Sequence, residues 1–402
     1  MLGLNYAPEP IGIGPYTSGL AEALVERGHT VEVVAGQPYY PEWKLYPRFK
    51  RTWKTSEEHG VKITRCPHYI PSNPTSARRM AHHASFASSC YPAARKVRRE
   101  LKPELVFTVA PSMIAAPVAL RMARRAGVPM WLHVQDFEVG AALATGLIDS
   151  TSRTADAAAR FEDRMLRSAD LVSTISEPMC DLLGRKNVDP ARIMEMRNWA
   201  NHADAMDRAD GSRFRREWGL EGKTVALYSG NIANKQGLDI VIEAARQMAD
   251  RQDIVFVISG EGPNRLKLER LAQGLSNVLF RDLQPEGSIG DLLTMADIHL
   301  LPQLHDAADL VLPSKLGNML ASGRPVIATV RPNTGIAREL VNCGIVVPPE
   351  VPEAIASAIG ALASHPDYRT TMGLAAKERA REAWSKQSVV DRFEEGLERL
   401  LG

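Results

Sequence analysis

Five short segments of the chain combine glycine with polar or charged residues in patterns that suit phosphate binding. In the first, residues 5–19, Gly12 and Gly14 let the backbone approach a ligand closely. Pro15 suits the first turn of a helix, and Gly28 suits the position just after its end. The N–H groups at the start of that helix are able to bind a phosphate. A purely structural turn is the alternative.

The third segment, YSGNIANKQGLD at residues 228–239, follows an apolar run in the second half of the chain. Ser229, Gly230 and Asn231 come directly after the run, and Lys235 stands shortly before a helical pattern. A lysine close to a helix N-terminus is a suitable ligand for a diphosphate. The segment is not a P-loop, because no Gly-Lys-Ser or Gly-Lys-Thr follows.

Two later segments add a second glycine turn and a second lysine. Gly260 and Glu261 lie in the sequence SGEG after another apolar run, where ordinary turn chemistry is the alternative. In LPSKLGNML we expect Ser314 to cap a helix that starts at Lys315 and ends near Gly323. Lys315 would then lie beside a helix N-terminus.

The second segment is HVQD, residues 133–136, at the end of an apolar strand. His133 could contact a reacting sugar or hold Asp136 in place, and a merely structural histidine is the equal alternative. Together the five segments suit a diphosphate ligand held between two domains. No Asp-x-Asp triplet occurs, so we expect no metal, and lysines and helix ends would neutralise a leaving diphosphate.

Short Val-, Ile- and Leu-rich runs alternate with helical patterns along the whole chain. Such runs are typical of buried parallel strands, and the alternation occurs twice, which predicts two doubly wound α/β domains. Ligands of such domains bind at the carboxyl ends of the strands, where the five segments lie. The predicted strands are 31–35, 105–109, 130–134, 170–174, 224–229, 254–259, 277–280, 297–302, 325–329 and 344–347.

A polar stretch near residues 197–212 breaks the alternation and marks a domain boundary. We therefore expect an N-terminal acceptor-binding domain at 1–197 and a C-terminal nucleotide-sugar-binding domain at 198–380. The tail is helical, and we expect its last part, 381–402, to return to the first domain. The first strand looks clipped, because only Met1 to Leu4 precede the first loop; either this strand is short or the true start lies upstream.

The composition excludes several other classes. The chain has 402 residues, 45% hydrophobic and 24% charged, which is ordinary for a globular protein and excludes general disorder. Four scattered cysteines form no metal-binding or disulfide pattern, which favours a reducing cytoplasmic compartment. We find no signal peptide and no run long enough to span a bilayer.

Basic and aromatic residues concentrate in the first half. Residues 44–125 contain 17 Lys or Arg against four Asp or Glu, which predicts an anionic partner such as a membrane surface. Tyr39, Tyr40 and Trp43 begin a run of aromatics mixed with basic residues, which suits stacking on acceptor sugars. Single-stranded nucleic acid would use the same mixture, but no nucleic-acid-binding motif accompanies it. Packing of this segment on the core is the alternative.

The chain resembles glycosyltransferase family 4, which has the GT-B fold of two Rossmann-like domains facing a central cleft. The resemblance covers nearly the whole chain and is closest to a colanic-acid-type subgroup. It implies a retaining enzyme that takes a sugar from a GDP- or UDP-linked donor and needs no other cofactor, and the missing Asp-x-Asp triplet leads us to expect that it is metal-independent. The acceptor would be a saccharide on a polyprenyl diphosphate, at the inner face of the cytoplasmic membrane. The matching motifs are GLNYAPEPIGIGPYT, QPYYPEWKLYP, WLHVQD, RNWA, YSGNIANKQGLD and LPSKLGNMLASGRPVIA.

By resemblance, the Gly12–Gly14 loop approaches the donor phosphates, His133 the transferred sugar and Lys235 the diphosphate. Two features depart from the family. Asn231 stands where an arginine is usual, and the paired glutamates eight residues apart are missing. Asn318 aligns with the second glutamate, which contacts the nucleoside ribose. The first aligns with Leu310, one residue from Asp309, and Asp306 is another candidate for its role.

Three other functions remain open from the sequence. A nucleotide-sugar 2-epimerase shares the fold but needs acid and base carboxylates, which the two glycine turns supply poorly. A non-catalytic sugar- or nucleotide-binding protein would be favoured by loss of His133 and Lys235, and both are present. A nucleic-acid binder is motivated by charge alone.

Overall fold

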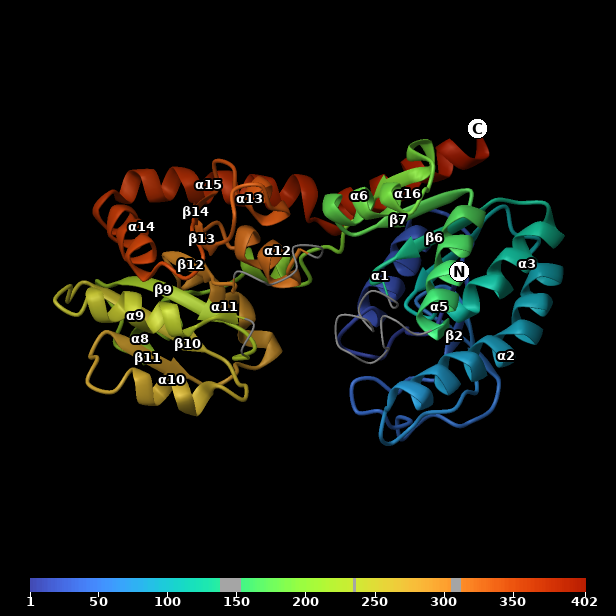
Figure 1. Cartoon of the computed structure of the whole chain (residues 1–402), viewed down its shortest axis with the longest axis horizontal. Helices are drawn as coiled ribbons and strands as arrows, with labels where there is room; N and C mark the ends of the chain where they lie inside the picture. Colours follow the sequence, from blue (N-terminus) through green and yellow to red (C-terminus); the bar gives the residue numbers. More distant parts are fainter. Residues whose placement is uncertain (138–152, 234–235, 305–311) are drawn as a thin grey trace. The chain divides into compact units, whose positions relative to one another are not determined.

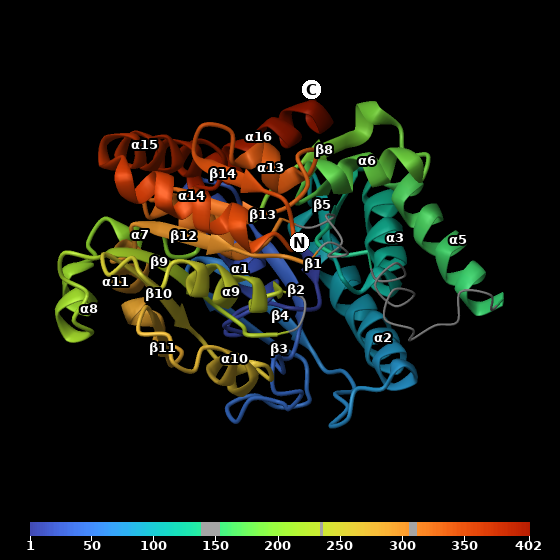
Figure 2. The same ribbon diagram turned by 60° about the vertical axis from the view of Figure 1, so that its left-hand side comes forward.

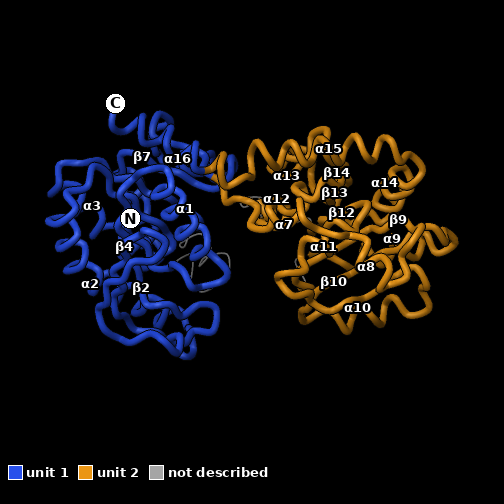
Figure 3. The backbone as a smooth tube through the Cα atoms, turned by 180° about the vertical axis from the view of Figure 1, so that it is seen from behind, with its two compact units in different colours: residues 1–196, 390–402 blue, residues 197–389 orange. Residues whose placement is uncertain are grey.

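The computed structural model describes residues 1–137, 153–233, 236–304 and 312–402. The chain divides into two compact units (Figure 3). Unit 1 comprises Met1–Met196 and Val390–Gly402, and unit 2 comprises Arg197–Val389. Among the described residues, no helix is both long enough and apolar enough to cross a membrane.

The described part of unit 1 is built on a sheet with the strand order β3-β4-β2-β1-β5-β6-β7-β8 (Figures 1 and 2). All neighbouring strands are parallel except β3, which is antiparallel to β4. The strand bounds are β1 Leu2–Gly3, β2 Glu32–Gly36, β3 Lys54–Glu58, β4 Val61–Cys66, β5 Val106–Ala110, β6 Met130–Val134, β7 Leu171–Thr174 and β8 Ile193–Glu195.

Helices cover both faces of this sheet. On one face Met130, Leu132 and Val134 of β6 pack with apolar residues of helices that precede and follow this strand in the sequence. On the other face the ring of Trp131 stacks on Phe393 of the C-terminal helix, 4.6 Å between centroids. The last helix thus packs on unit 1. The helix bounds are α1 Gly14–Glu26, α2 Ser76–Leu101, η1 Met113–Ala115, α3 Ala116–Ala126, α5 Arg153–Ser168, α6 Glu177–Arg185, η2 Pro190–Arg192 and α16 Lys386–Leu401.

Unit 2 is built on a parallel sheet whose described strands have the order β11-β10-β9-β12-β13-β14. Alternate residues of β9 enter different cores: Val225 and Leu227 pack on one face, and Ala226 and Tyr228 on the other. The strands are β9 Thr224–Ser229, β10 Ile254–Ser259, β11 Val278–Arg281, β12 Ile298–Leu301, β13 Val326–Thr329 and β14 Gly344–Val347. The helices are α7 Ala203–Met206, α8 Ser212–Glu217, α9 Asp239–Gln247, α10 Arg265–Leu271, η4 Glu286–Ser288, α11 Ile289–Thr294, α12 Ser314–Ala321, α13 Gly335–Glu339, α14 Pro352–Ser364 and α15 Pro366–Ala383.

All ten strands predicted from apolar runs are present within one residue at each end. Three further strands, β3, β4 and β8, were not predicted. β3 reads KTSEE and lies at the sheet edge, where its side chains are mostly exposed, so it carries no apolar signal. We expected the chain to leave the second domain at residue 380. The division falls at 389/390 instead, because Trp384 is buried in the core of unit 2.

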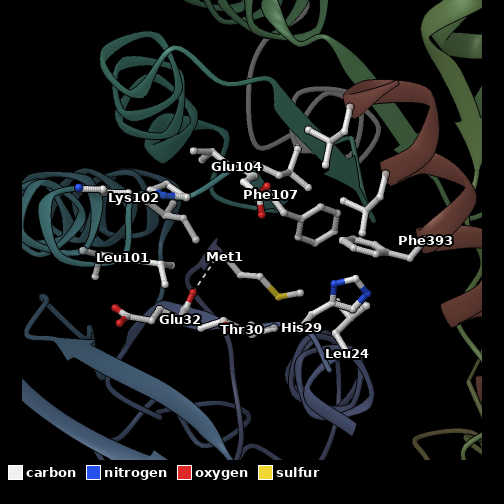
Figure 4. Close-up of a pocket in the computed structure, with 18 of the residues that line it drawn as sticks. Met1, Leu24, His29, Thr30, Glu32, Leu101, Lys102, Glu104, Phe107 and Phe393 are labelled. Carbon is white, nitrogen blue, oxygen red and sulfur yellow. Dashed lines mark hydrogen bonds between the residues drawn. The ribbon is translucent and has the colours of Figure 1, made fainter. Parts of the chain in front are cut away.

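β1 is two residues long, although it lies at the centre of the sheet between β2 and β5. The ammonium group of Met1 donates to the backbone oxygen of Glu32 at 2.6 Å. A cavity of about 690 Å³ opens at this end of the sheet, and Leu24, Phe107 and Phe393 line it (Figure 4). It lies at the amino ends of β1, β2 and β5, so it is separate from the loops that follow their carboxyl ends.

Candidate functional site

In unit 1 the first glycine loop leads directly into α1. The helix begins at Gly14, with Pro15 in its first turn, as predicted. Gly12 has φ +74° and Gly28 has φ +92°, a left-handed backbone that favours glycine. A Cβ atom on Gly14 would lie 3.2 Å from the backbone oxygen of Glu9, so the loop folds tightly back on the helix start. This loop therefore needs glycine for its shape, whether or not it binds a phosphate.

Glu9 organises this loop, and sequence reasoning missed it. Its side chain is buried, and Oε1 accepts the backbone N–H groups of Tyr39 and Tyr40 at 2.9 and 3.0 Å. Oε2 accepts from the side chain of Asn5 at 2.9 Å. Burial raises the pKa of Glu9, although these hydrogen bonds oppose the shift. A charged residue between Pro8 and Pro10 was the available signal.

Arg65 of β4 also makes a hydrogen bond to this loop. Its side chain is 2% exposed, and Nη2 donates to the backbone oxygen of Ala7 at 2.7 Å. Its guanidinium also lies near the rings of Tyr6 and Phe49, 5.8 and 5.1 Å from their centroids. One of the basic residues in 44–125 is therefore part of the protein interior and is not available to an anionic surface.

The aromatic residues predicted to bind the acceptor lie at different depths. Tyr39 is 4% exposed, and its ring meets those of Trp43 and His82 edge-on, at 5.2 and 4.6 Å between centroids. This burial supports the packing alternative for Tyr39. Tyr40 and Trp43 are half-buried and pack against the same core. Arg79 of α2 lies over the Trp43 ring at 5.4 Å.

His133 lies inside β6 and not in the loop after it. It is 3% exposed, and its ring stacks on Phe107 at 6.0 Å between centroids. Its Nδ1 lies 2.8 Å from Oγ of Ser173 on β7. Burial lowers the pKa of His133 to about 3, so the ring is neutral at pH 7. These contacts support the structural alternative for His133. Asp136 is exposed beyond the end of the strand.

In unit 2 the two glycine turns are in direct backbone contact. Gly230 donates its N–H to the oxygen of Ser259 at 3.0 Å, and Ile232 donates to the oxygen of Glu261 at 2.8 Å. A Cβ atom on Gly262 would lie 2.2 Å from the oxygen of Ile232. The turns after β9 and β10 thus form one platform at the carboxyl ends of two neighbouring strands.

Arg265 of α10 stabilises the turn after β10 by hydrogen bonds. It donates to the backbone oxygen of Gly260 at 3.0 Å and to Oε1 of Glu261 at 2.7 Å. It also pairs with Asp282 at 2.7 Å. The carboxylate of Glu261 is therefore held by a positive neighbour at the edge of the platform.

Lys315 brings a positive charge to the platform. Its Nζ lies 4.2 Å from the ring centroid of buried Tyr228, and a Cβ atom on Gly230 would lie 3.9 Å from that same Nζ. The phenol of Tyr228 donates to the backbone oxygen of Asn231 at 2.6 Å, which fixes the turn under the lysine. The start of α12 and the turn after β9 are thus adjacent, although Gly230 and Lys315 are 85 positions apart in the sequence.

Ser314 is not the helix cap that the sequence predicted, and Asn318 of the same helix bonds to a neighbouring segment. Ser314 is the first residue of α12, and Pro313 precedes the helix as its N-cap, so Ser314 does not cap it. Asn318 lies one turn further on, where its Oδ1 accepts the backbone N–H of His202 at 3.1 Å. One of its polar atoms therefore holds a neighbouring segment.

Several predicted positions fall outside the described residues. These are Lys235, Asp306, Asp309 and Leu310. Ser229 and Asn231 lie in the first glycine turn, and Asn231 is exposed. Within the described ranges, no group of three or more His, Cys, Asp or Glu is arranged to hold a metal ion.

Family comparisons match both halves of the chain. Residues 12–199 match the glycosyl transferase 4-like domain, and residues 223–365 match glycosyl transferases group 1. The chain is 36% identical over 403 residues to the protein named colanic acid biosynthesis glycosyl transferase WcaI of Escherichia coli K12, covering 97% of each chain. It is 28% identical to the alpha-D-kanosaminyltransferase of Streptomyces kanamyceticus, covering 69% of this chain and 72% of that one.

Solved structures share the fold. Sucrose-phosphate synthase from Thermosynechococcus elongatus superposes with a TM-score of 0.70 at 16% identity, covering 99% of this chain and 98% of that one. The lipopolysaccharide glycosyltransferase WaaG superposes with a TM-score of 0.63 at 17% identity and full coverage of both chains. Two doubly wound α/β units with a returning C-terminal helix are the GT-B architecture. The chain belongs to glycosyltransferase family 4, as its motifs predicted.

Proposed function

We propose that this protein is a retaining glycosyltransferase that moves a sugar from a nucleoside-diphosphate donor to a saccharide acceptor in exopolysaccharide or cell-envelope glycan synthesis. The observation that carries the proposal is the position of Lys315 beside Gly230, at the carboxyl end of β9 and the start of α12. Identity to a protein named for colanic acid biosynthesis supports the pathway class.

The donor diphosphate would bind over the platform formed by the two glycine turns. The first turn of α12 and the ammonium of Lys315 both favour negative charge there. Lys235 joins them by its place in the same loop sequence. These fixed positive groups would stabilise the charge that grows on the departing diphosphate, so we propose that transfer needs no metal.

Lys315→Ala tests this assignment. Titration calorimetry with UDP and GDP should show binding to the native protein and weakening of about tenfold or more in the variant. Lys377→Ala is the matched control, because Lys377 lies in the same unit and pairs at the surface with Asp207. Equal binding by Lys315→Ala would refute the role of this lysine. A transfer assay in EDTA, with the product anomer determined by NMR, tests retention and metal independence.

We also propose that unit 1 associates with the inner face of the cytoplasmic membrane, where a polyprenyl-diphosphate-linked acceptor would lie. Helices α2 and α3 pack side by side (Figures 1 and 2), and Arg95, Arg98, Arg121 and Arg125 surround a shallow hollow between them. Basic residues near an anionic surface contribute about 1 kcal/mol each, and salt screens them.

Vesicle pelleting tests this association. The protein should bind vesicles that contain anionic lipid, release them in high salt, and ignore neutral vesicles. Arg98→Glu combined with Arg121→Glu should reduce binding and leave nucleotide affinity unchanged. Equal binding to neutral vesicles would contradict the proposal.

A further inference from the structure

Two segments of unit 2 meet beside the points where the chain passes between the units. The chain enters unit 2 at Arg197 and leaves it after Val389. We call residues 197–202 and 384–389 the crossing segments. Ala200 of the first donates its N–H to the backbone oxygen of Trp384 of the second at 2.8 Å. The guanidinium of Arg197 also lies over the buried Trp384 ring, 5.5 Å from the centroid. The crossing segments are therefore fastened to each other.

One buried carboxylate joins both crossing segments. Glu339, the last residue of α13, is 4% exposed, and its Oε1 lies 2.7 Å from Nη1 of Arg197. Its Oε2 accepts from Nε1 of Trp384 at 3.0 Å. Arg379 of α15 donates to both oxygens, at 3.2 and 2.9 Å. Removal of this carboxylate would take the shared acceptor from two arginines and an indole N–H.

The charge of this cluster is consistent with its geometry. Burial by itself raises the pKa of Glu339, but hydrogen bonds from Arg379 and the nearby charge of Arg197 outweigh it and lower the pKa. Glu339 is therefore ionised at neutral pH, and the ion pairs with both arginines are maintained.

The same segments pack on α12, the helix whose first turn carries Lys315. A Cβ atom on Gly317 would lie 2.5 Å from Cε3 of Trp384, so the indole ring rests directly on the helix backbone. On the first crossing segment, His202 donates its N–H to Oδ1 of Asn318 at 3.1 Å. Each crossing segment thus makes its own contact with the helix at the candidate donor site.

We propose that Glu339 is a positioning residue that holds both crossing segments against α12, so that occupation of the donor site is transmitted to the points where the chain leaves unit 2. The inference rests on the proposed function, because it takes a nucleoside diphosphate as the ligand beside Lys315. A contiguous packed network can carry coupling of this kind, and the contacts from α12 to Trp384 and Glu339 form one.

Hydrogen exchange of the full chain tests the proposal, with and without saturating UDP or GDP. Glu339→Gln keeps the size of the side chain and removes its charge. Glu378→Gln is the control, because that carboxylate lies exposed on the neighbouring α15 and pairs with Arg381. Without nucleotide, the amides of Ala200 and His202 should exchange about tenfold faster in Glu339→Gln than in the native protein and the control.

The response to nucleotide separates positioning from mere stabilisation. Nucleotide should slow exchange in the crossing segments of the native protein and the control. In Glu339→Gln it should not, while the Kd for nucleotide stays within about threefold. In a transfer assay this variant should have a lower kcat and nearly the same donor KM. The donor should still bind, but in a position less suited to reaction.

Two outcomes would overturn the inference: equal protection by nucleotide in Glu339→Gln and native protein, or unchanged exchange of Ala200 without nucleotide. If the native protein bound neither nucleotide, the proposed function would fail, and the exchange of Ala200 would still report on the cluster. Trp384→Phe serves if Glu339→Gln does not fold, because it keeps a ring on Gly317 and removes the N–H donated to Glu339. It should change exchange in the same direction.

Discussion

A Cβ atom on Gly260 would lie 1.9 Å from the backbone oxygen of Gly230. The two glycine turns of unit 2 therefore reach their contact distance only because Gly260 carries no side chain. Its φ of +150° is also one that other residues rarely adopt. This contact connects the ends of β9 and β10 into the platform on which we place the donor diphosphate.

Gly260→Ala should therefore separate the two turns. The added methyl group cannot be accommodated without moving backbone, so we expect a loss of about 1–3 kcal/mol in the free energy of unfolding. Nucleotide affinity should fall as well, because the Gly230 turn moves with the contact. Urea unfolding and calorimetry measure the two effects. Gly287→Ala is the control, since a Cβ there meets nothing within 4 Å. An unchanged stability of Gly260→Ala would show that the turns are not in contact.

Variants of His133 should affect stability more than chemistry. His133→Phe keeps an aromatic ring against Phe107 and loses the contact with Ser173. We expect it to retain most of the transfer rate per folded molecule, whereas His133→Ala should lose about 2–4 kcal/mol of stability by opening a cavity. Thermal unfolding and initial rates separate the two. A folded His133→Phe protein without activity would restore the sugar-contacting role expected from the sequence.

The histidines of unit 1 should make it unstable to acid. His68 and His82 stack edge-on, 4.8 Å between centroids, and His82 meets His83 at 5.2 Å. Burial lowers the pKa of His68 to about 3, and those of His82 and His83 to about 4, below the ordinary 6.5. The unfolded chain therefore binds protons first. The contribution of these histidines to the free energy of unfolding is fully present above pH 6.5. It should fall as pH drops to 4, by about 1.4 kcal/mol per pH unit for each histidine.

His68→Phe should reduce this slope by one proton. Urea unfolding between pH 4 and pH 7 measures it. His59→Gln is the control, because His59 lies on an exposed turn between β3 and β4. Identical slopes for His68→Phe and the native protein would contradict the prediction.

The amino group of Met1 should give a second pH dependence in protein that begins at this residue. Burial lowers its pKa from 8.0 to about 6, although the nearby charge of Glu32 opposes the shift. Its contribution to stability is complete above pH 8 and is lost as pH falls to 6. Two valines placed before Met1 should abolish this dependence and raise the Tm, by lengthening β1 towards the cavity. A Gly-Gly extension should remove only the pH dependence. No change in Tm with valine would show that β1 does not extend.

The alternation of buried apolar runs determined most of the fold. A strand covered on both faces needs apolar residues at successive positions, so runs such as IVFVIS at β10 could be recognised without any tertiary information. The same order of strand and loop put the glycine segments at carboxyl ends, and the motifs were sufficient to identify the family. The edge strand β3 was not predicted, because its residues are exposed and polar and form no apolar run.

Only the tertiary structure decided which of these residues meet. His133 and Asp136 are three positions apart in the sequence. His133 is buried inside the sheet and Asp136 is exposed, because pairing with the neighbouring strands decides where β6 ends. Lys315 reaches Gly230 through the parallel order of β9 and β12, which brings distant loops to one edge. Glu339 gave no signal of its own, because its partners Arg197 and Trp384 are far away in the sequence. Contacts of this kind arise from packing between elements, which local residue patterns do not record.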